Sequence, residues 1–390
     1  MSLGGSRHRF GGLDRALQKV VETGSGAVDV VEAAAERLLK VVPADVWCAV
    51  LLDPSTLLDT GGVHRAGFPE HVMPRLFEIE HVEQDDVDNL RALTRRSTPV
   101  SSLRVSTGGA LETSGYYRDI LQPLDLADEL RVLLRERGRT WGMLVLCRAT
   151  DSAPFDARDL AAARTLATPA TRAVRRALVV GGVDEASITD GPGVLVLDHA
   201  RRMIACSPSA ERMMARIEDA GPIGRPTSCP YAVHAVAAAA RAGRPGTTAR
   251  SRVRTRDGRW LELHAWHSLT EPRPVTMVSI GPAEPSLLVP LVLAAYGLSE
   301  QQQRIAGLVM HGHSSEEVLA ALHITRNTLN DHLEKIFDKV GVRSRRELPA
   351  ALFSRHYLPR PSPGPLTLDG RLTDPHVPHT RGVSPLRPST

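Results

Sequence analysis

The sequence predicts a multidomain protein in which two α+β domains precede an all-α four-helix domain. Its 390 residues exceed what one ordinary hydrophobic core supports, so two or three domains are expected. Short apolar strands interspersed with helical stretches continue to about residue 284, and a dense series of helix-capping signals follows between residues 298 and 348. With 42% hydrophobic and 24% charged residues, the composition is typical of globular proteins.

The first expected domain comprises residues 13–180 and follows a basic, glycine-rich and flexible N-terminus at residues 1–12. Its apolar residues alternate between helical and strand spacing along the chain. The expected elements are two helices within 13–42 separated by a glycine-containing break at 23–26, a strand at Val46–Leu52, strands at 128–135 and 141–147 paired across 136–139, and a closing helix at 156–178. Antiparallel strands with helices packed on them predict an α+β domain.

The end of this domain resembles a known sensor family. Residues 141–146 read WGMLVL and are followed by Asp156 and the long helix, a succession that resembles the end of a GAF domain. Residues 117–134 are similar to a segment found in actinobacterial regulators that carry GAF domains. The resemblance implies a GAF-like sensor over residues 13–180, and it assigns no ligand.

A glycine-rich and polar stretch at residues 181–192 predicts a linker to a second α+β module at residues 193–284. The expected elements are strands at 193–198, 203–206, 252–255, 260–265 and 275–280, with a helix at 207–217. This order of elements resembles a truncated PAS domain. The resemblance implies a small PAS-like module.

The third expected domain, residues 285–357, is divided into four helices by polar caps and glycine stops. Expected capping boxes pair Ser299 with Gln302, Ser314 with Glu317 and Ser344 with Glu347, and the expected stops are Gly312 and Gly341. In such a box the hydroxyl caps a free N–H of the first turn, and the longer side chain reaches back to the cap residue. Thr325 predicts the N-cap of the third helix, which should run to about Val340.

The third helix carries the candidate functional surface. Its apolar stripe, Leu329, Leu333, Ile336, Phe337 and Val340, is expected to be buried and to leave a polar outer face. A short helix, a tight turn and a helix with a polar outer face form the helix-turn-helix arrangement, which places side chains in the major groove of DNA. The predicted base-reading residues are Asn327, Asn330, Asp331 and Glu334, and the predicted phosphate contacts are Ser314, Thr325, Arg326, Thr328, His332, Lys335, Lys339, Arg343, Ser344, Arg345 and Arg346.

The same run resembles the LuxR-type regulator domain over nearly all of its length. The matching residues are Leu298, Ser299, Gly312, Ser314, Glu317, Val318, Ile324, Thr325, Thr328, His332, Ile336, Lys339, Gly341, Val342, Arg343, Ser344 and Arg345. The resemblance implies a cytoplasmic activator or repressor whose third helix reads double-stranded DNA and whose fourth helix contributes to a homodimer. It allows RNA polymerase and a small-molecule effector as further partners.

Three departures from the family pattern bear on DNA affinity. Asn330 and Glu334 stand where the family often has lysine, and residues 298–357 carry eight basic against seven acidic side chains. Affinity for the DNA backbone should therefore be modest per subunit and strengthened by dimerisation. Pro349 is expected to bend or delay the fourth helix.

Two alternatives remain open at this point. The nearly neutral helical domain also suits a protein-binding signalling adaptor whose helix-turn-helix has lost its DNA affinity. Residues 49–53 read AVLLD and resemble the phosphorylated strand end of a response-regulator receiver, which would make Asp53 the phosphate acceptor. A receiver should also have an acidic pair near the N-terminus and a later strand-end lysine, yet no lysine occurs between Lys40 and Lys335.

Several classes of function are not predicted. No P-loop and no hydrolase or metalloprotease motif is present, so an enzyme is not expected. The four cysteines, Cys48, Cys147, Cys206 and Cys229, are widely spaced, and His311 and His313 have no third ligand nearby, so neither a metal site nor a cofactor is predicted. No signal peptide or apolar run of membrane-spanning length is found, and the eight prolines of residues 358–390 predict a disordered tail.

Overall fold

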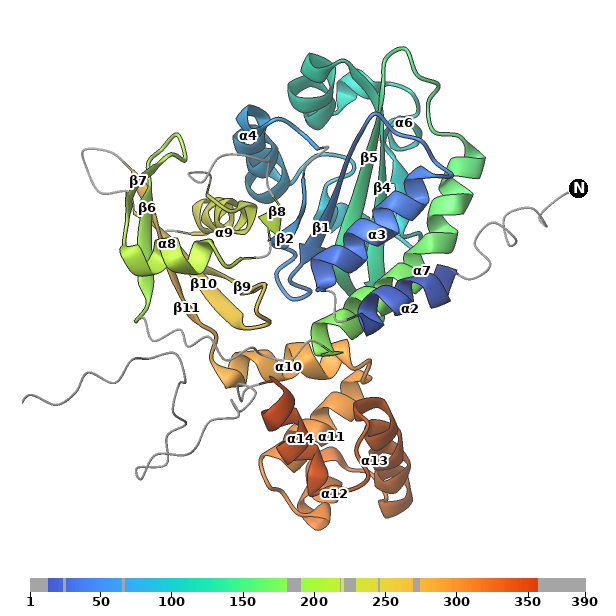
Figure 1. The fold of residues 1–390 in the computed structure, drawn as a ribbon, viewed down its shortest axis with the longest axis vertical. Helices are drawn as coiled ribbons and strands as arrows, with labels where there is room; N and C mark the ends of the chain where they lie inside the picture. The colour runs from blue at the N-terminus through green and yellow to red at the C-terminus, as the bar shows by residue number, and fades with distance from the viewer. Residues whose placement is uncertain are drawn as a thin grey trace, which may run out of the picture.

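The computed structural model describes residues 13–23, 26–64, 67–180, 191–217, 219–220, 229–244, 246–268 and 274–356. The flexible N-terminus, most of the linker at 181–192 and the proline-rich tail predicted from the sequence lie outside the described residues. Figure 1 shows two sheet-containing units side by side, with a small helical domain beneath them.

The first unit is built on a sheet with the strand order β3-β4-β5-β1-β2-β8. Its strands are β1 (Val46–Leu52), β2 (Asp59–Val63), β3 (Val100–Ser102), β4 (Leu126–Glu136), β5 (Arg139–Ala149) and β8 (Asp219–Ala220). The predicted pairing across residues 136–139 is confirmed, because Glu136 pairs with Arg139. Arg137 and Gly138 both have positive φ, as a two-residue turn between right-twisted strands requires. The remaining pairs are antiparallel except β2 with β8, which is parallel.

Three helices cover one face of this sheet: α2 (Leu13–Glu22), α3 (Ala27–Leu39) and α7 (Ala157–Val180). These are the helices predicted for the two ends of the first domain. Their buried side chains form one core with Leu144 and Leu146, which point to this side of β5. Met143 and Val145 alternate with them and point to the opposite face.

A series of short helical segments covers that opposite face and was not predicted from the sequence. They are η1 (Glu70–Val72), α4 (Met73–Glu78), η2 (Ile79–Glu83), α5 (Leu90–Arg95), α6 (Leu103–Ser106), η3 (Leu111–Thr113), η4 (Tyr117–Leu121) and η5 (Gln122–Leu124). Each spans one turn or two, which is too short to display helical periodicity in a sequence window. Their apolar side chains, such as Phe77 and Leu90, pack in one cluster with Met143 and Val145.

The second unit contains a sheet with the strand order β7-β6-β11-β10-β9. Its strands are β6 (Gly193–Leu197), β7 (Met203–Cys206), β9 (Thr248–Arg254), β10 (Trp260–Ser268) and β11 (Val275–Pro282). When the strands of each unit are numbered separately along the chain, the order in this sheet is second, first, fifth, fourth, third. The first five strands of the first unit have the same order in their sheet. The predicted strands of this unit are therefore present in one antiparallel sheet.

Two helices complete the second unit, α8 (Pro208–Met214) and α9 (Tyr231–Ala242). The helix α9 was not predicted, and it lies between the two sheets (Figure 1). Its Ala232 and Val236 belong to the same hydrophobic cluster as Val50 and Val145 of the first sheet. The two α+β units therefore share one continuous core.

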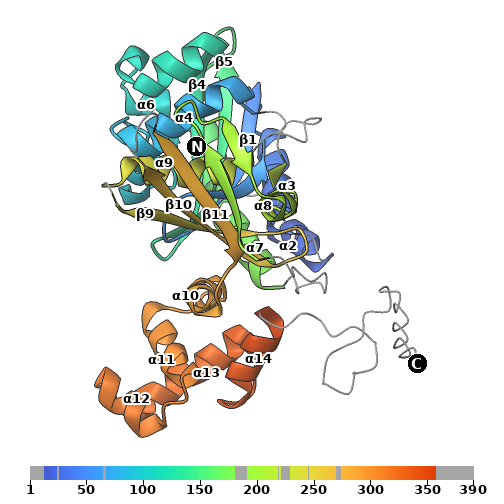
Figure 2. The same cartoon turned by 90° about the vertical axis from the view of Figure 1, so that its left-hand side faces the viewer.

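The helical domain contains α11 (Glu300–Met310), α12 (Ser315–Leu322), α13 (Arg326–Val340) and α14 (Glu347–His356), which correspond to the four predicted helices. The expectation of four helices for residues 285–357 requires a correction, because α10 (Pro285–Ala295) precedes them as a fifth. Figure 2 shows α10 between the sheet-containing units and α11 to α14. Among the described residues, no helix combines the length and the apolar character needed to cross a membrane.

The receiver alternative is wrong. The strand before Asp53 belongs to a predominantly antiparallel sheet, whereas receivers have a parallel one. The Asp53 side chain is also buried and accepts two hydrogen bonds from Arg252, at 2.8 Å from Nε and 2.7 Å from Nη2. The carboxylate is committed to an ion pair that joins the two α+β units.

Candidate nucleic-acid interface

The caps that position the helix-turn-helix form as the sequence predicts. The Ser299 hydroxyl accepts a hydrogen bond from the Gln302 N–H at 3.3 Å, and the Gln302 side chain accepts one from the Ser299 N–H at 3.0 Å. Ser314 and Glu317 make the same reciprocal pair at the start of α12, at 3.3 and 2.6 Å. The hydrogen bond from the Ser314 N–H holds the pKa of the Glu317 carboxyl below its usual value. The orientation of α12 is thereby fixed ahead of the turn.

The turn and both ends of α13 also follow the sequence prediction. His323 adopts the left-handed conformation at φ 51°, and Thr325 caps α13 by accepting from the Thr328 N–H at 3.2 Å. Gly341 ends the helix at φ 72°, where an added Cβ would meet no other atom within 4 Å. Leu329, Leu333, Ile336 and Val340 are buried, with Phe337 packed at the edge of the same core.

The four predicted base-reading residues lie on one exposed strip of α13. Asn327, Asn330, Asp331 and Glu334 are spaced i, i+3, i+4 and i+7, which places them along a single helix face. All four are exposed, and within the described part of the chain none of their side chains makes a hydrogen bond or an ion pair. This strip offers amide and carboxylate groups that are free to meet another molecule.

The predicted phosphate contacts differ in whether other groups of the chain engage their side chains. Lys335, Arg343 and Arg346 are exposed, and no partner engages their side chains among the residues that the structure describes. Arg326 forms an ion pair with Glu316. Thr325 and Thr328 share a hydrogen bond between their hydroxyls at 2.9 Å, while His332 is half-buried.

Lys339 and Arg345 are held by internal contacts. The Lys339 ammonium donates to the Gly297 carbonyl at 2.9 Å and to the Gln302 side chain at 2.7 Å. Burial, together with nearby cations, lowers the pKa of Lys339. Arg345 donates to the Ser315 hydroxyl at 3.0 Å and to a backbone carbonyl, so it fastens the loop before α14 to the start of α12. Both cations stabilise the fold of the domain.

The predicted third capping box is wrong in its details. The Ser344 hydroxyl does accept from the Glu347 N–H at 3.3 Å, but the Glu347 carboxylate accepts from the Arg343 N–H at 2.7 Å. The helix α14 begins only at Glu347, so Pro349 occupies its first turn. A proline is tolerated there because the N–H groups of a first turn have no partner within the helix.

A junction with the first α+β unit was missed by the sequence analysis. The Gly297 carbonyl, between α10 and α11, accepts from the Arg137 side chain at 2.6 Å as well as from Lys339. Arg139 donates to the Gln303 side chain at 3.3 Å, and Arg175 donates to the Ala295 carbonyl at 3.1 Å. The tip of the β4–β5 hairpin and α7 thus contact the helical domain, and no local sequence signal indicates a contact across so long a separation.

This arrangement of capped helices agrees with a family comparison. Residues 297–350 match the family described as "Bacterial regulatory proteins, luxR family". These residues form a LuxR-family domain. The match includes α11, α12 and α13 and ends within the first turn of α14. The match is confined to this segment, and its description names bacterial regulatory proteins.

Comparisons over the rest of the chain are weaker. No curated protein matches the chain significantly. Among solved structures, similarity is found to a GAF domain/HD domain protein from Geobacter sulfurreducens, at 18% identity over 38% of this chain and 93% of that chain with a TM-score of 0.29. The Vibrio cholerae VqmA dimer, whose description mentions LuxR-type receptors, matches at 11% identity over 43% and 84% of the two chains with a TM-score of 0.18. Scores this low do not establish a shared fold.

Proposed function

We propose that this protein, in which residues 297–350 match the LuxR family, is a one-component transcriptional regulator that reads specific DNA sequences in the major groove with α13. The observation that carries the proposal is the exposed and unengaged strip of Asn327, Asn330, Asp331 and Glu334 on a capped helix of helix-turn-helix geometry. Asn330 can make a bidentate pair with adenine, and Asp331 can accept a hydrogen bond from the cytosine amino group. Lys335, Arg343 and Arg346 are the proposed phosphate contacts that need no rearrangement.

The proposal extends to the other parts of the chain. The first α+β unit serves as a GAF-like sensor and the second as a PAS-like module, which the shared strand order of their sheets supports. The protein acts on DNA as a homodimer in the cytoplasm, where the bacterial chromosome and RNA polymerase are found. Dimerisation compensates for a helical domain whose charge is nearly balanced.

The test is DNA binding by the full chain with three matched variants. Genomic fragments selected by the wild-type protein are compared with random duplexes over a range of salt concentrations. Asn330→Ala should lower discrimination by about 5- to 150-fold, which corresponds to about 1–3 kcal/mol, with little effect on random DNA. Lys335→Ala should weaken all duplexes alike and reduce the salt slope by about 1.

Arg158→Ala supplies the control, because it removes the same charge from an exposed position on α7 of the first unit. It should leave both readouts unchanged. Equal effects of Asn330→Ala on selected and random DNA would contradict the base-reading role. Absence of salt-sensitive binding at low salt would instead favour the protein-binding adaptor.

A further inference from the structure

The tip of the β4–β5 hairpin carries two cations beside the helical domain. Arg137 is exposed, and its Nη1 donates to the Gly297 carbonyl at 2.6 Å. Arg139 is half-buried, and its Nη2 donates to the Gln303 side chain at 3.3 Å. A guanidinium has five N–H donors, and among the described residues neither of these two makes any further hydrogen bond or ion pair. Both arginines therefore keep N–H groups that can bind another acceptor.

The backbone at Arg137 is unusual for a long side chain. Its φ of 53° lies in the left-handed region, where two-residue hairpin turns usually have asparagine, aspartate or glycine. A bulky residue in this region is strained, and such a residue suggests a functional constraint. The bond to Gly297 uses one donor of the side chain, so the position is a poor one for arginine unless the rest of its guanidinium is also used.

A ridge of α13 connects this hairpin tip with the proposed base-reading strip. Asp331, Lys335 and Lys339 follow one another at intervals of four residues, so they lie in one row along the helix. Lys339 donates to the same Gly297 carbonyl as Arg137. Lys335 is exposed, one turn closer to the strip. The cations therefore form a continuous line from the first α+β unit to the surface proposed to meet DNA.

The positive charge of this line is only partly balanced. Burial lowers the pKa of Lys339, and the charges that lower it further are three cations: Arg137, Arg175 and Lys335. Glu136 forms an ion pair with Arg175, whose side chain is only 12% exposed. An anion that approached the exposed cations would therefore be attracted.

Two carboxylates near the line form no ion pair among the described residues. Glu300 is exposed and lines a recess together with Arg137 and Arg139. Asp338 is exposed on α13, three residues after Lys335. Both oppose the binding of an anion, and Glu300 offers a test in which removal of a negative charge should strengthen it.

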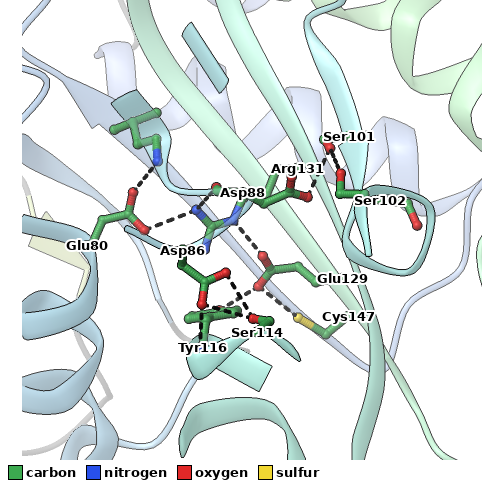
Figure 3. A network of polar contacts seen from close by, with 12 residues as sticks. Glu80, Asp86, Asp88, Ser101, Ser102, Ser114, Tyr116, Glu129, Arg131 and Cys147 are labelled. Carbon is green, nitrogen blue, oxygen red and sulfur yellow. Dashed lines mark hydrogen bonds and ion pairs between the residues drawn. The ribbon is translucent and has the colours of Figure 1, made fainter. Parts of the chain in front are cut away.

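The hairpin that carries the two arginines is held firmly. In the middle of β4, Arg131 donates to Glu129 at 2.5 Å and to Glu80 at 3.1 Å, within a buried polar network (Figure 3). Nearer the tip, Arg135 donates to the Arg96 carbonyl at 2.6 Å. A contact made from a strand that is already ordered costs little conformational entropy.

We propose, on the basis of the DNA binding proposed above, that the β4–β5 hairpin is a second DNA-contacting element, in which Arg137 and Arg139 bind phosphates outside the segment that α13 reads. Guanidinium groups bind phosphate through paired N–H groups, which suits the donors left free here. A duplex is favoured over a small anion because the cations are spread along a surface that leads to α13, and a duplex presents its phosphates in a row.

The test measures the salt dependence of binding by the full chain to a duplex selected by the wild type. The slope of log affinity against log salt falls by about 0.9 for each phosphate contact that is lost, so Arg137→Gln with Arg139→Gln should reduce it by about 1.8. Between about 50 and 200 mM salt, the wild type should then lose about 12-fold more affinity than this double variant. In hydroxyl-radical footprints, the double variant should keep the central protection and lose protection of the flanking backbone.

Two further variants separate a phosphate contact from a role in positioning the helical domain. Arg175→Gln removes another hydrogen bond of the same junction, the one to the Ala295 carbonyl, but its side chain is buried, so the salt slope should not change. Glu300→Gln should strengthen binding about twofold, as expected for removal of one repulsive charge at about 8 Å in water.

The outcomes distinguish this proposal from the proposed function. If the double variant binds DNA with an unchanged slope and footprint, the hairpin contact is overturned while base reading by α13 stands. An equal loss of slope in Arg175→Gln would also overturn it, because the hairpin would then act only by positioning α13. Absence of salt-sensitive binding by the wild type would overturn both proposals.

Discussion

The helix α10 has two apolar faces that belong to different hydrophobic cores. Leu288 and Leu291 pack in the core formed by α2, α3, α7 and the first sheet. Leu293 packs in the core of the LuxR-family domain, two positions from Leu291. Truncation of either leucine should therefore destabilise one part of the protein and spare the other.

The two leucines are matched in size and burial, because Leu291 is 4% and Leu293 is 2% exposed. Replacement by alanine removes three carbon atoms, worth about 2.4 kcal/mol in transfer free energy at about 0.8 kcal/mol each. The cavity left behind raises the cost toward about 5 kcal/mol where the surroundings do not collapse. The smaller figure alone corresponds to about 50-fold faster exchange of the amides that the affected core protects.

Hydrogen exchange followed by mass spectrometry distinguishes the two cores. Leu291→Ala should accelerate exchange in α7 and β5 while α13 keeps its protection, and Leu293→Ala should do the reverse. Val180→Ala, at a 49% exposed position on α7, serves as the control and should change neither. If both leucine variants accelerate exchange in α7 and α13 to the same extent, the chain unfolds as one unit and the separation of the cores is refuted.

Three further predictions concern other parts of the structure. In a double-mutant cycle of Asp53→Asn and Arg252→Met, each single change should cost about 3–5 kcal/mol of unfolding free energy, and additivity within about 0.5 kcal/mol would disprove the buried pair. Burial lowers the pKa of His356 to about 4, so the unfolded chain binds more protons and stability should fall by about 3 kcal/mol between about pH 6.5 and 4. In urea titrations over this pH range, the His356→Gln variant should lack this part of the pH dependence of the unfolding free energy. Gly341→Ala should lower the free energy of unfolding in urea by about 1 kcal/mol. The left-handed φ of 72° disfavours a residue with a Cβ, and no neighbouring atom lies close enough to add a steric clash.

The elements that the sequence predicted are those whose signals are local. The β4–β5 hairpin is marked by its turn residues, and α11, α12 and α13 are marked by caps and glycine stops. The missed helices α9 and α10 are buried on several sides and rich in alanine, valine and leucine. Such helices have no polar face, so the periodicity that reveals an amphipathic helix is absent.

The candidate interface also contains features with local sequence signals and features without them. The exposure of Asn330 and Asp331 follows from their position opposite the apolar stripe of α13, which the sequence displays. The commitment of Lys339 depends on the Gly297 carbonyl, and that of Arg345 depends on Ser315. These partners lie about 30 or more residues away in sequence, so only the folded structure distinguishes held cations from free ones.

The junction at Gly297 limits how the two α+β units, the proposed sensors, can influence α13. The Gly297 carbonyl accepts from Arg137 on one side and from Lys339 near the C-terminal end of α13 on the other. The proposed base-reading strip lies one to three turns further toward the N-terminus of the helix, and the first α+β unit does not contact it among the described residues. A shift of the β4–β5 hairpin would therefore tilt α13 without altering the side chains that are proposed to face DNA. In the dimer proposed above, regulation would then act on the spacing and angle of the two proposed recognition helices. Because the helical repeat of DNA is fixed, a change in that spacing or angle would change the affinity for DNA.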